Sequence, residues 1–385
     1  MGQRRPPGLT KRGGIWHIDK QIGGIRVRES TGTCDLAQAE KYLARRVDQA
    51  QQARLYGRRV DRTFRAAATK YLEENQHKRS ISDDAMHLGA LDPYIGDRIL
   101  RQVHLGTLQE FIAKRRIDGV KTKTINAALA VVRRIVNLAT TEWIDEQGMT
   151  WLEMAPRIKL FPVTDARAPY PLSADEQAIL FQELPPDLAR MALFKVNTGT
   201  REHEVCTLKW EYEVKVPELE TSVFLVPAEQ VKNGEERLVV LNRVARSVIE
   251  SCRGMHPTFV FVRESKRHAP RPVTGMNNTA WKSARERAAA VWAERYGETA
   301  SDGFRRVRVH DLKHTFGRRL RAAGVSFEDR QDLLGHKSGR ITTHYSKAEL
   351  SNLIAASEKV CEHNPHKVTT TTWLKRRAPK LEIAK

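Results

Sequence analysis

Hydrophobic residues recur at helical spacing over residues 61–154. The clearest stripe contains Ile125, Leu129, Val132, Ile135, Val136, Ala139 and Trp143. Positions three and four residues apart lie on one face of a helix, so this stripe predicts a long amphipathic helix with one buried side. Shorter stripes of the same spacing start at Phe64 and Leu108. The pattern therefore predicts an all-helical bundle of four or five helices over residues 61–154.

The residues before this bundle follow a different pattern. Short runs within residues 14–27 alternate in polarity and are broken by glycines, which is typical of short strands joined by tight turns. Helical spacing begins at about Leu36, and Asp35 with Gln38 three residues later resembles a capping box. We expect a small domain of two or three strands and one helix over residues 1–60.

The second half of the chain begins with four prolines within sixteen residues, a density that no helix tolerates, so residues 155–172 are predicted to be a linker. Ser173, with Glu176 three residues later, resembles a capping box that opens the next helix. Beyond it, strands are predicted at 223–226, 237–241 and 258–262, and helices near 187–197, 243–252, 277–296 and 310–322. The expected fold is multidomain α+β, with a mixed but mainly helical third domain at 173–364 and a basic tail at 365–385.

Charge is the first indication of function. The chain has 385 residues, which is enough for two or three domains. Its 66 lysines and arginines exceed its 46 aspartates and glutamates, which gives a formal net charge of +20. Such an excess is typical of proteins that bind a polyanion. Nucleic acid fits better than an anionic membrane, because no predicted helix has a wide face of Trp, Phe and Leu opposite a face of Lys and Arg. A basic surface that only aids solubility is the alternative.

Three further features narrow the class of protein. No stretch approaches the roughly 18 apolar residues of a membrane span, and the basic N-terminus lacks the apolar segment of a secretory signal. The four cysteines are scattered without a Cys-x-x-Cys pair, which argues against a disulfide scaffold or a zinc finger. We therefore expect a cytoplasmic protein without a membrane segment.

Four segments of the third domain place polar residues where they could take part in chemistry. In the first, Arg201 opens a helix directly after a Thr-Gly turn, and Glu204 lies one turn further on. A guanidinium at a helix N-terminus is unfavourable unless an anion also lies there, so Arg201 is a candidate anion ligand that Glu204 could hold. A surface salt bridge is the alternative. The second is Lys232, beside the Asn233-Gly234 turn, which could supply a cation or an acid if this turn covers a site.

The third segment contains His310 and His314, spaced i, i+4 on a predicted helix. The spacing superficially resembles a zinc site, but Asp311 is too short to replace the usual glutamate base and no third ligand is evident. His310 and Lys313 lie one turn apart on the same helix. The basic residues around them predict a helix that faces an anion.

The fourth segment contains His336 and, nine residues later, Tyr345. By itself such a tyrosine is most often a core or capping residue. Together the four segments supply arginine, lysine and histidine side chains to neutralise a phosphate, and a tyrosyl oxygen to attack it. No acidic cluster that would bind a metal is evident, so the cations would take the place of Mg²⁺.

The order of these segments resembles the catalytic domain of the tyrosine recombinases, and specifically the phage and prophage integrases. The likeness spans about residues 173–362. It is carried by Thr198-Gly199-x-Arg201-x-x-Glu204, by Lys232 in a hairpin, by His310-Asp311-Leu312-x-His314-Thr315-Phe316, by Leu333-Leu334-Gly335-His336 and by Tyr345. In this family, the segment that begins at His310 usually has an arginine at the position of Lys313. A lysine offers a single point charge there, whereas an arginine offers two parallel N–H donors.

The resemblance implies a mechanism without a metal, ATP or any other cofactor. The implied catalytic residues are Arg201, Lys232, His310, Lys313, His336 and Tyr345, with Glu204 in support. Tyr345 would attack the scissile phosphate and form a 3′-phosphotyrosine, while Arg201, Lys313 and His336 stabilise the phosphorane. Lys232 would protonate the leaving 5′-oxygen, and His310 would assist in proton handling.

The remaining regions fit the same resemblance. Residues 1–60 resemble the arm-binding domain of the lambda-type integrases, and residues 61–154 resemble the core-binding domain. The implied partners are therefore core-type and arm-type attachment sites in double-stranded DNA. Candidate DNA contacts are Arg12, Lys20, Arg26, Arg28, Lys121, Lys123, Arg133 and Arg134. Four protomers would exchange strands through a four-way junction at the nucleoid of a bacterial host, with a host DNA-bending protein and an excisionase as further partners.

Two other functions share part of this pattern. A catalytically weakened relic or regulator of the same family would bind DNA without cleaving it. A type IB topoisomerase would use the same chemistry without site dependence, but the arm-like N-terminal domain disfavours it. A nicked suicide substrate separates enzyme from regulator, because only the enzyme accumulates a covalent adduct.

Overall fold

The computed structural model describes residues 7–22, 25–56, 59–146, 148–263, 269–336 and 347–362. The chain divides into two compact units, Met1–Arg167 and Ala168–Lys385. Within the described ranges, helices predominate and the sheets are small and antiparallel, as the predicted α+β class requires. Among the described helices, none has the length and the apolar character needed to cross a membrane.

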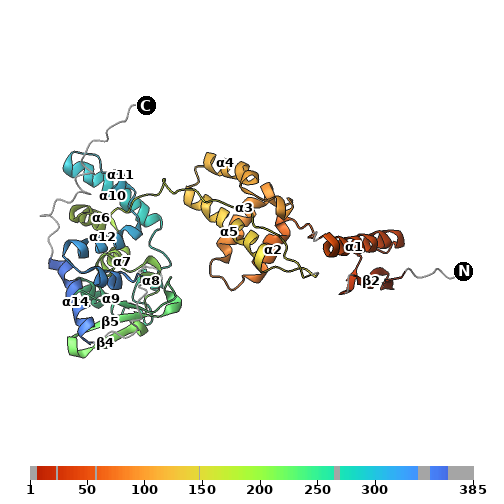
Figure 1. The fold of residues 1–385 in the computed structure, drawn as a ribbon. Coiled ribbons are helices and arrows are strands. Elements are labelled where there is room, and N and C mark those ends of the chain that lie inside the picture. Colours follow the sequence, from red (N-terminus) through yellow and green to blue (C-terminus); the bar gives the residue numbers. More distant parts are fainter. Residues whose placement is uncertain are drawn as a thin grey trace. The chain divides into compact units, whose positions relative to one another are not determined.

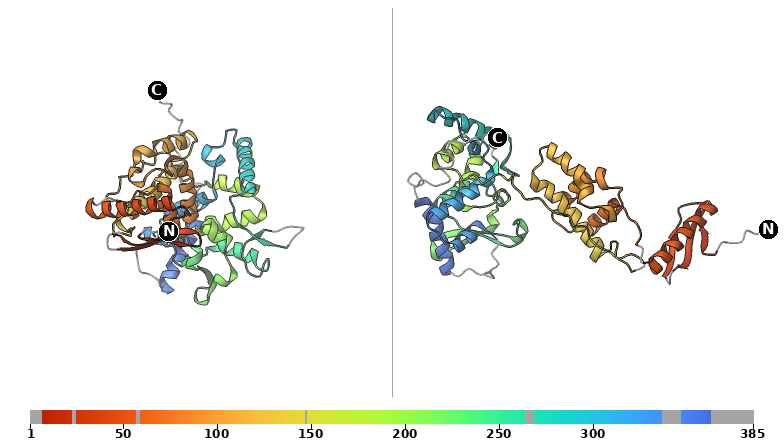
Figure 2. Two further views of the ribbon diagram at one scale, coloured as in Figure 1. Left: turned by 90° about the vertical axis from the view of Figure 1, so that its right-hand side faces the viewer. Right: turned by 45° about the horizontal axis from the view of Figure 1, so that its top comes forward.

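The first unit begins with a three-stranded antiparallel sheet and one helix (Figures 1 and 2). The elements are β1 (Leu9–Arg12), β2 (Ile15–Ile22), β3 (Ile25–Ser30) and α1 (Leu36–Tyr56). Leu9 and Ile18 on one face of the sheet pack against Ala39 and Leu43 of α1. This small core leaves the other face of the sheet uncovered by α1. The Gln38 N–H donates to the Asp35 carboxylate at 2.8 Å, which confirms the predicted cap of this helix.

The helical part of the first unit follows the predicted stripes. Its α-helices are α2 (Phe64–Glu74), α3 (Ile81–Ile95), α4 (Gln109–Ile117) and α5 (Thr122–Thr141), with short 3-10 turns η1 (Leu100–Gln102) and η2 (Leu105–Leu108). All seven residues of the long stripe are buried. Trp143 lies just beyond the end of α5, where its indole Nε1 donates to Glu74 Oε2 at 2.7 Å. The described residues therefore confirm a bundle of four α-helices.

The proline-rich segment contains neither helix nor strand, as predicted. Within the first unit it is held along α5, because Asn126 hydrogen-bonds both the C=O and the N–H of Phe161, at 2.7 and 2.9 Å. Asp165 accepts from the Thr122 N–H at the start of α5, at 2.8 Å. Within the second unit, the Leu172 N–H donates to the Thr315 hydroxyl at 3.0 Å.

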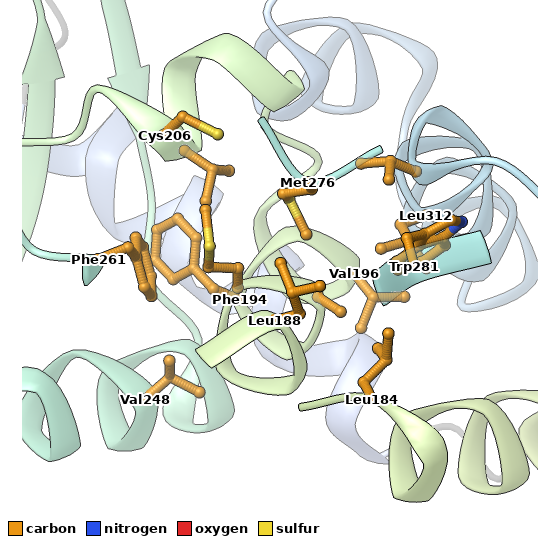
Figure 3. Close-up of a cluster of buried hydrophobic side chains, with 14 of the residues drawn as sticks. Leu184, Leu188, Phe194, Val196, Cys206, Val248, Phe261, Met276, Trp281 and Leu312 are labelled. Carbon is orange, nitrogen blue, oxygen red and sulfur yellow. The ribbon is translucent and has the colours of Figure 1, made fainter. Parts of the chain in front are cut away.

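The second unit is built around a buried helix, α7. Its helices are α6 (Ala174–Glu183), α7 (Pro186–Thr198), α8 (Glu202–Cys206), α9 (Arg243–Cys252), α10 (Thr279–Tyr296), α11 (Asp302–Arg305), α12 (Val309–Ala322), α13 (Phe327–Leu334) and α14 (Lys347–Glu362). Figure 3 shows Leu188 and Phe194 of α7 among side chains from other elements, such as Phe261 and Met276. Ser173 and Glu176 form the predicted capping box at the start of α6.

A three-stranded antiparallel sheet lies beside these helices, in the order β4-β5-β6. The second unit's strands are β4 (Glu213–Val216), β5 (Thr221–Val226), β6 (Arg237–Val239), β7 (Val262–Arg263) and β8 (Arg271–Pro272), and its 3-10 turns are η3 (Trp210–Tyr212), η4 (Pro217–Leu219) and η5 (Ala228–Gln230). β4 was not among the predicted strands, although its Glu-Val-Lys-Val alternation is a strand pattern.

One prediction about these strands needs correction. The strand at 258–262 is wrong for most of its length, because only Val262 belongs to a strand and Phe259 forms an isolated bridge. Its apolar residues, such as Val260 and Phe261, are buried as a core-lining loop instead of in a sheet ladder. β5 and β6 pair as antiparallel neighbours, and the connection between them contains η5 and then Gly234, which has a positive φ of 69°.

Candidate active site

Arg201 and Glu204 form the first part of the site. Gly199 ends α7 with a φ of 62°, and a Cβ at this position would lie 2.7 Å from the Phe316 ring. Arg201 then caps α8, where its N–H donates to Glu204 Oε2 at 2.7 Å and its Nη1 donates to Glu204 Oε1 at 2.8 Å. The Glu204 side chain is only 1% exposed. The alternative of a surface salt bridge is therefore wrong. Glu204 holds the Arg201 guanidinium from the buried side of the site.

Arg237 is a member of this cluster that the sequence analysis missed. It lies at the start of β6 with its side chain 3% exposed, and it forms an ion pair with Glu204. Its Nη2 donates to the carbonyls of Gly199 at 3.1 Å and Leu333 at 3.3 Å. Burial would raise the pKa of Glu204, but the charge of Arg237 and the hydrogen bonds from Arg201 outweigh it and lower that pKa. The signal was present, since Arg237 lies two residues before the apolar Val239 and therefore on the same face of β6.

Lys313 projects from α12 into the same cluster. Its side chain is buried, and its ammonium donates to the carbonyl of Leu334 at the end of α13. Burial, followed by the charges of Arg237 and Arg201, lowers the pKa of Lys313 to about 6.

The C-terminal end of α13 is where three cations converge. The carbonyls of three successive residues, Leu333, Leu334 and Gly335, each accept a hydrogen bond from a different cationic side chain. These donors are Arg237 from β6, Lys313 from α12 and, at 3.1 Å, Nη2 of Arg201 from the start of α8. The carbonyl end of a helix carries a partial negative charge that favours cations. Gly335 closes the helix with a φ of 57°, and His336 follows directly.

The histidines flank this cluster. His310 and His314 lie together on α12 with their ring centroids 4.9 Å apart, and burial and the charge of His314 lower the pKa of His310 to about 4. Burial and the charge of Lys313 also lower the pKa of His336. His310 and His336 are therefore neutral at pH 7 and can each accept or donate a proton.

Asp311, between these histidines, faces the protein interior. Its carboxylate accepts from the N–H of Arg308 at 2.8 Å and of Tyr170 at 3.1 Å. It anchors the start of α12 and the end of the proline-rich segment. The residues that the structure describes contain no group of three or more His, Cys, Asp or Glu that could hold a metal ion.

The loop that carries Lys232 touches the same cluster. Lys232 is exposed, and its neighbour Asn233 lies with Oδ1 3.5 Å from Nη2 of Arg201. The Asn233 amide nitrogen also donates to the carbonyl of Gly335, at 3.4 Å. Tyr345 lies outside the described residues, as does the tail at 365–385. α14 starts two residues after Tyr345 and packs against α12 and α13.

Lys195 is the second residue that the sequence analysis missed. This lysine of α7 is completely buried, and its ammonium donates to the carbonyl of Thr200, the residue before Arg201. Burial lowers the pKa of Lys195 to about 7, although Glu204 opposes the shift. A lysine between the apolar residues Phe194 and Val196, in the last turn of α7, was the available signal.

The candidate DNA contacts fall into two groups on the first unit. On β1 and β3, Arg12, Arg26 and Arg28 alternate with the core residues and therefore lie on the sheet face that α1 leaves uncovered. Arg26 and Arg28 both pair with Asp19, at 2.9 and 3.4 Å. Lys20 pairs with Val27 across the strands and so lies on the other face. The second group, which is exposed on and beside α5, is Lys121, Lys123, Arg133 and Arg134.

Two family models match the chain. The model described as "Phage integrase family" matches residues 173–351, and the model described as "Phage integrase N-terminal domain" matches residues 8–53. Together they cover more than half of the sequence.

Curated relatives and solved structures point to the same family. The integrase of Salmonella phage P22 is 24% identical over 389 residues, which span 91% of this chain and 94% of the relative. The tyrosine recombinase XerA of Thermococcus kodakarensis is 24% identical over 256 residues, which span 65% of this chain and 79% of the relative.

Among solved structures, a lambda integrase dimer bound to a COC′ core site is similar in fold, with a TM-score of 0.54, 15% identity, and coverage of 91% of this chain and 96% of that one. A lambda integrase tetramer bound to a Holliday junction has a TM-score of 0.52, 16% identity, and coverage of 90% and 100%. The fold, the matched family models and the relatives agree, and the chain belongs to the phage integrase family of tyrosine recombinases.

Proposed function

We propose that this chain is a site-specific DNA recombinase that integrates and excises a mobile element through a 3′-phosphotyrosine intermediate. The observation that carries the proposal is the convergence of Arg201, Arg237 and Lys313 on the end of α13, directly before His336. A cluster of two arginines and a lysine, of which Arg237 and Lys313 are buried, beside two histidines is suited to stabilise the extra negative charge of a phosphorane.

The proposed reaction uses the residues of the site in sequence. Tyr345 gives up its hydroxyl proton to His310 and attacks the scissile phosphorus, so that an O–P bond to the tyrosine forms while the bond to the 5′-oxygen of the next nucleotide breaks. Arg201 and Lys313 exchange their carbonyl partners for the non-bridging phosphate oxygens, and His336 donates a hydrogen bond to the same group. Lys232 delivers a proton to the leaving 5′-oxygen. Attack by a 5′-hydroxyl reverses these steps and rejoins the strand.

The proton handling also follows from the site. Because its lowered pKa leaves His310 neutral, it can pass a proton to or from Lys313, which lies one turn away on α12. The protein's cations carry the charge that Mg²⁺ carries in many phosphoryl transfer enzymes. No metal or ATP is required by this scheme.

The proposed partners are core-type and arm-type attachment sites in double-stranded DNA, at the nucleoid in the cytoplasm of a bacterial host. The solved lambda integrase structures, which are bound to a core site and to a Holliday junction, support the core-type partner and a homotetramer on DNA. A host DNA-bending protein and an excisionase are proposed as further partners. The proposed division is an arm-binding domain at 1–60, a core-binding domain at 61–154, a linker at 155–172, a catalytic domain at 173–364 and a tail at 365–385.

One observation favours a second candidate, a DNA-binding regulator that has lost cleavage. Lys313 stands where an arginine is usual in this family, and its lowered pKa leaves it without a permanent charge. Such a protein would bind the same sites and leave the phosphodiester bond intact.

Covalent adduct formation separates the two candidates. The probes are short duplexes that tile the direct repeats flanking the coding region, each with one nick so that a cleaved fragment diffuses away. The full chain should form an adduct that survives denaturing electrophoresis on at least one duplex, and Tyr345→Phe should bind that duplex without forming it. Binding without any adduct would favour the regulator, whereas an adduct with Tyr345→Phe would overturn the role of this tyrosine.

A further inference from the structure

Arg237 connects three parts of the candidate active site that are far apart in the sequence. Its guanidinium forms an ion pair with Glu204 of α8. It also donates to the carbonyl of Gly199, in the turn before α8, and to the carbonyl of Leu333, at the end of α13. One side chain from β6 therefore ties the turn that presents Arg201 to the helix end that presents His336.

The position of Arg237 differs from that of a phosphate ligand. Its side chain is 3% exposed, whereas that of Arg201 is 19% exposed. Both Nη atoms of Arg237 donate hydrogen bonds to protein groups. Its Nε lies so close to Gly335 that a Cβ added to this glycine would be 2.7 Å from it. This Nε finds no hydrogen-bond partner among the described residues. A scissile phosphate can reach Arg201 without reaching Arg237.

The two arginines share Glu204. Glu204 Oε1 accepts from the Arg201 guanidinium, while Oε2 accepts from the Arg201 N–H and from Arg237. Removing Arg237 would leave a buried carboxylate with one cation instead of two, and would leave the carbonyls of Gly199 and Leu333 without this donor. A charge that loses its partner in a buried site is strongly unfavourable, so the local arrangement must relax.

Such relaxation would reach the residues that bind the phosphate. Arg201 and Lys313 are both aligned by carbonyls at the end of α13, those of Gly335 and Leu334. If this helix end shifts relative to Glu204, the two cations no longer point to a common position. A misplacement of about 1 Å in an active site can cost on the order of 100-fold in rate.

We infer that Arg237 is a positioning residue for DNA cleavage, which holds Glu204 and the end of α13 in the arrangement that aligns Arg201 and Lys313 on the scissile phosphate. This inference rests on the proposed function. Arg237 itself makes no contact with the reacting atoms. It therefore acts on the rate of the chemical step more than on the affinity for DNA.

The test compares Arg237→Met with the matched control Arg319→Met. Arg319 is another arginine of the same unit with a partly buried side chain, on α12, but it donates to Gln177 of α6 outside the cluster, at 2.8 Å. The substrate is the nicked duplex on which the parent chain forms an adduct. The measurements are the single-turnover rate of adduct formation at saturating protein, the Kd for the duplex and the thermal unfolding midpoint.

Arg237→Met should lower the maximal rate on the order of 100-fold while the Kd changes less than about threefold, and Arg319→Met should keep the parent rate. A double-mutant cycle with Glu204→Gln should be non-additive, because the second substitution removes a residue through which Arg237 acts. Arg237→Lys, which keeps the charge but cannot reach all three partners, should have an intermediate rate.

Three results would overturn the inference. The first is a folded Arg237→Met variant that cleaves at the parent rate. The second is an equal loss of rate in Arg237→Met and Arg319→Met, and the third is a strictly additive cycle with Glu204→Gln. If Arg237→Met shows no cooperative unfolding, Arg237→Lys decides: a slower rate at unchanged Kd supports the inference, and the parent rate overturns it. Failure of the parent chain to form any adduct would instead count against the proposed function.

Discussion

Arg201 donates from Nη2 to the carbonyl of Gly335 at 3.1 Å, so the arginine of the first box directly contacts the residue before His336. This contact joins two motifs that are distant in the sequence. Gly335 also packs against Arg237, and it has a positive φ of 57°. The glycine is therefore required both by its backbone conformation and by its neighbour.

Gly335→Ala should lower both stability and the rate of adduct formation. A left-handed conformation costs an alanine about 1–2 kcal/mol, and the new Cβ would lie 2.7 Å from Nε of Arg237. Gly324→Ala is a matched control, because Gly324 also has a positive φ, of 72°, but no atom within 4 Å of the added Cβ. Chemical denaturation and single-turnover cleavage measure both effects. Equal effects of the two substitutions would show that the contact with Arg237 is unimportant.

Lys313 should make cleavage depend on pH. With its pKa lowered to about 6, the protonated fraction of this lysine in the free protein falls as pH rises through that value. The second-order rate constant for adduct formation, which reports the free protein, should therefore decline at higher pH. Lys313→Arg stays charged and should flatten this decline, while Lys313→Ala should cost about 3 kcal/mol of transition-state stabilisation at pH 6, by analogy with an oxyanion donor. The exposed Lys282→Arg on α10 serves as the control. An unchanged pH profile for Lys313→Arg would contradict this role.

Lys195 should make folding stability rise with pH. Its pKa of about 7 in the folded chain lies below the ordinary value of 10.5, so the unfolded chain binds more protons between these values. The free energy of unfolding then increases across this window, by at most about 1.4 kcal/mol per pH unit for one lysine. Lys195→Met should reduce this slope. Unfolding midpoints at pH 7, 8 and 9 measure it, and the same slope in parent and variant would argue that Lys195 is not titrating there.

Adduct formation should persist in EDTA. The proposed charge stabilisation comes from Arg201, Lys313 and the neutral histidines, and the described residues offer no cluster for a metal. The measurement is the single-turnover rate with and without the chelator at constant ionic strength. Loss of the adduct on chelation and its recovery with Mg²⁺ or Zn²⁺ would reopen a metal site at His310 and His314.

The open face of the N-terminal sheet should bind the phosphates of arm-type DNA. The DNA duplexes for this test are those that copurify with the full chain. Binding to them should be weakened by each of the substitutions Arg12→Ala, Arg26→Ala and Arg28→Ala. Each lost phosphate contact should reduce the slope of log K against log salt by about 1. Lys41→Ala, on the exposed side of α1, removes one charge away from this face and should leave the slope unchanged. Equal effects at Lys41 and the three arginines would indicate a general charge effect without a defined face.

Local sequence alone was sufficient for many elements of the fold. The hydrophobic stripe that includes Ile125 and Leu129 predicted α5 and its buried face, because helical spacing needs no knowledge of what covers it. The capping box of Ser173 and Glu176 predicted the start of α6 for the same reason. Likewise, the spacing of Arg201 and Glu204 predicted that one would hold the other, since both lie within a single helical turn.

The chain's sequence by itself determined which chemical groups are present and in what order, from Arg201 through Lys313 to His336. Only the tertiary structure decided that these groups meet at the end of α13, and that Arg237 and Lys195 are buried among them. The physical reason is that helix spacing and capping depend on neighbouring residues, whereas the burial and pKa of a charged group depend on segments brought together from far apart. For the same reason the apolar run at 258–262 could not be recognised as a core-lining loop, because burial in a loop and in a strand selects the same side chains.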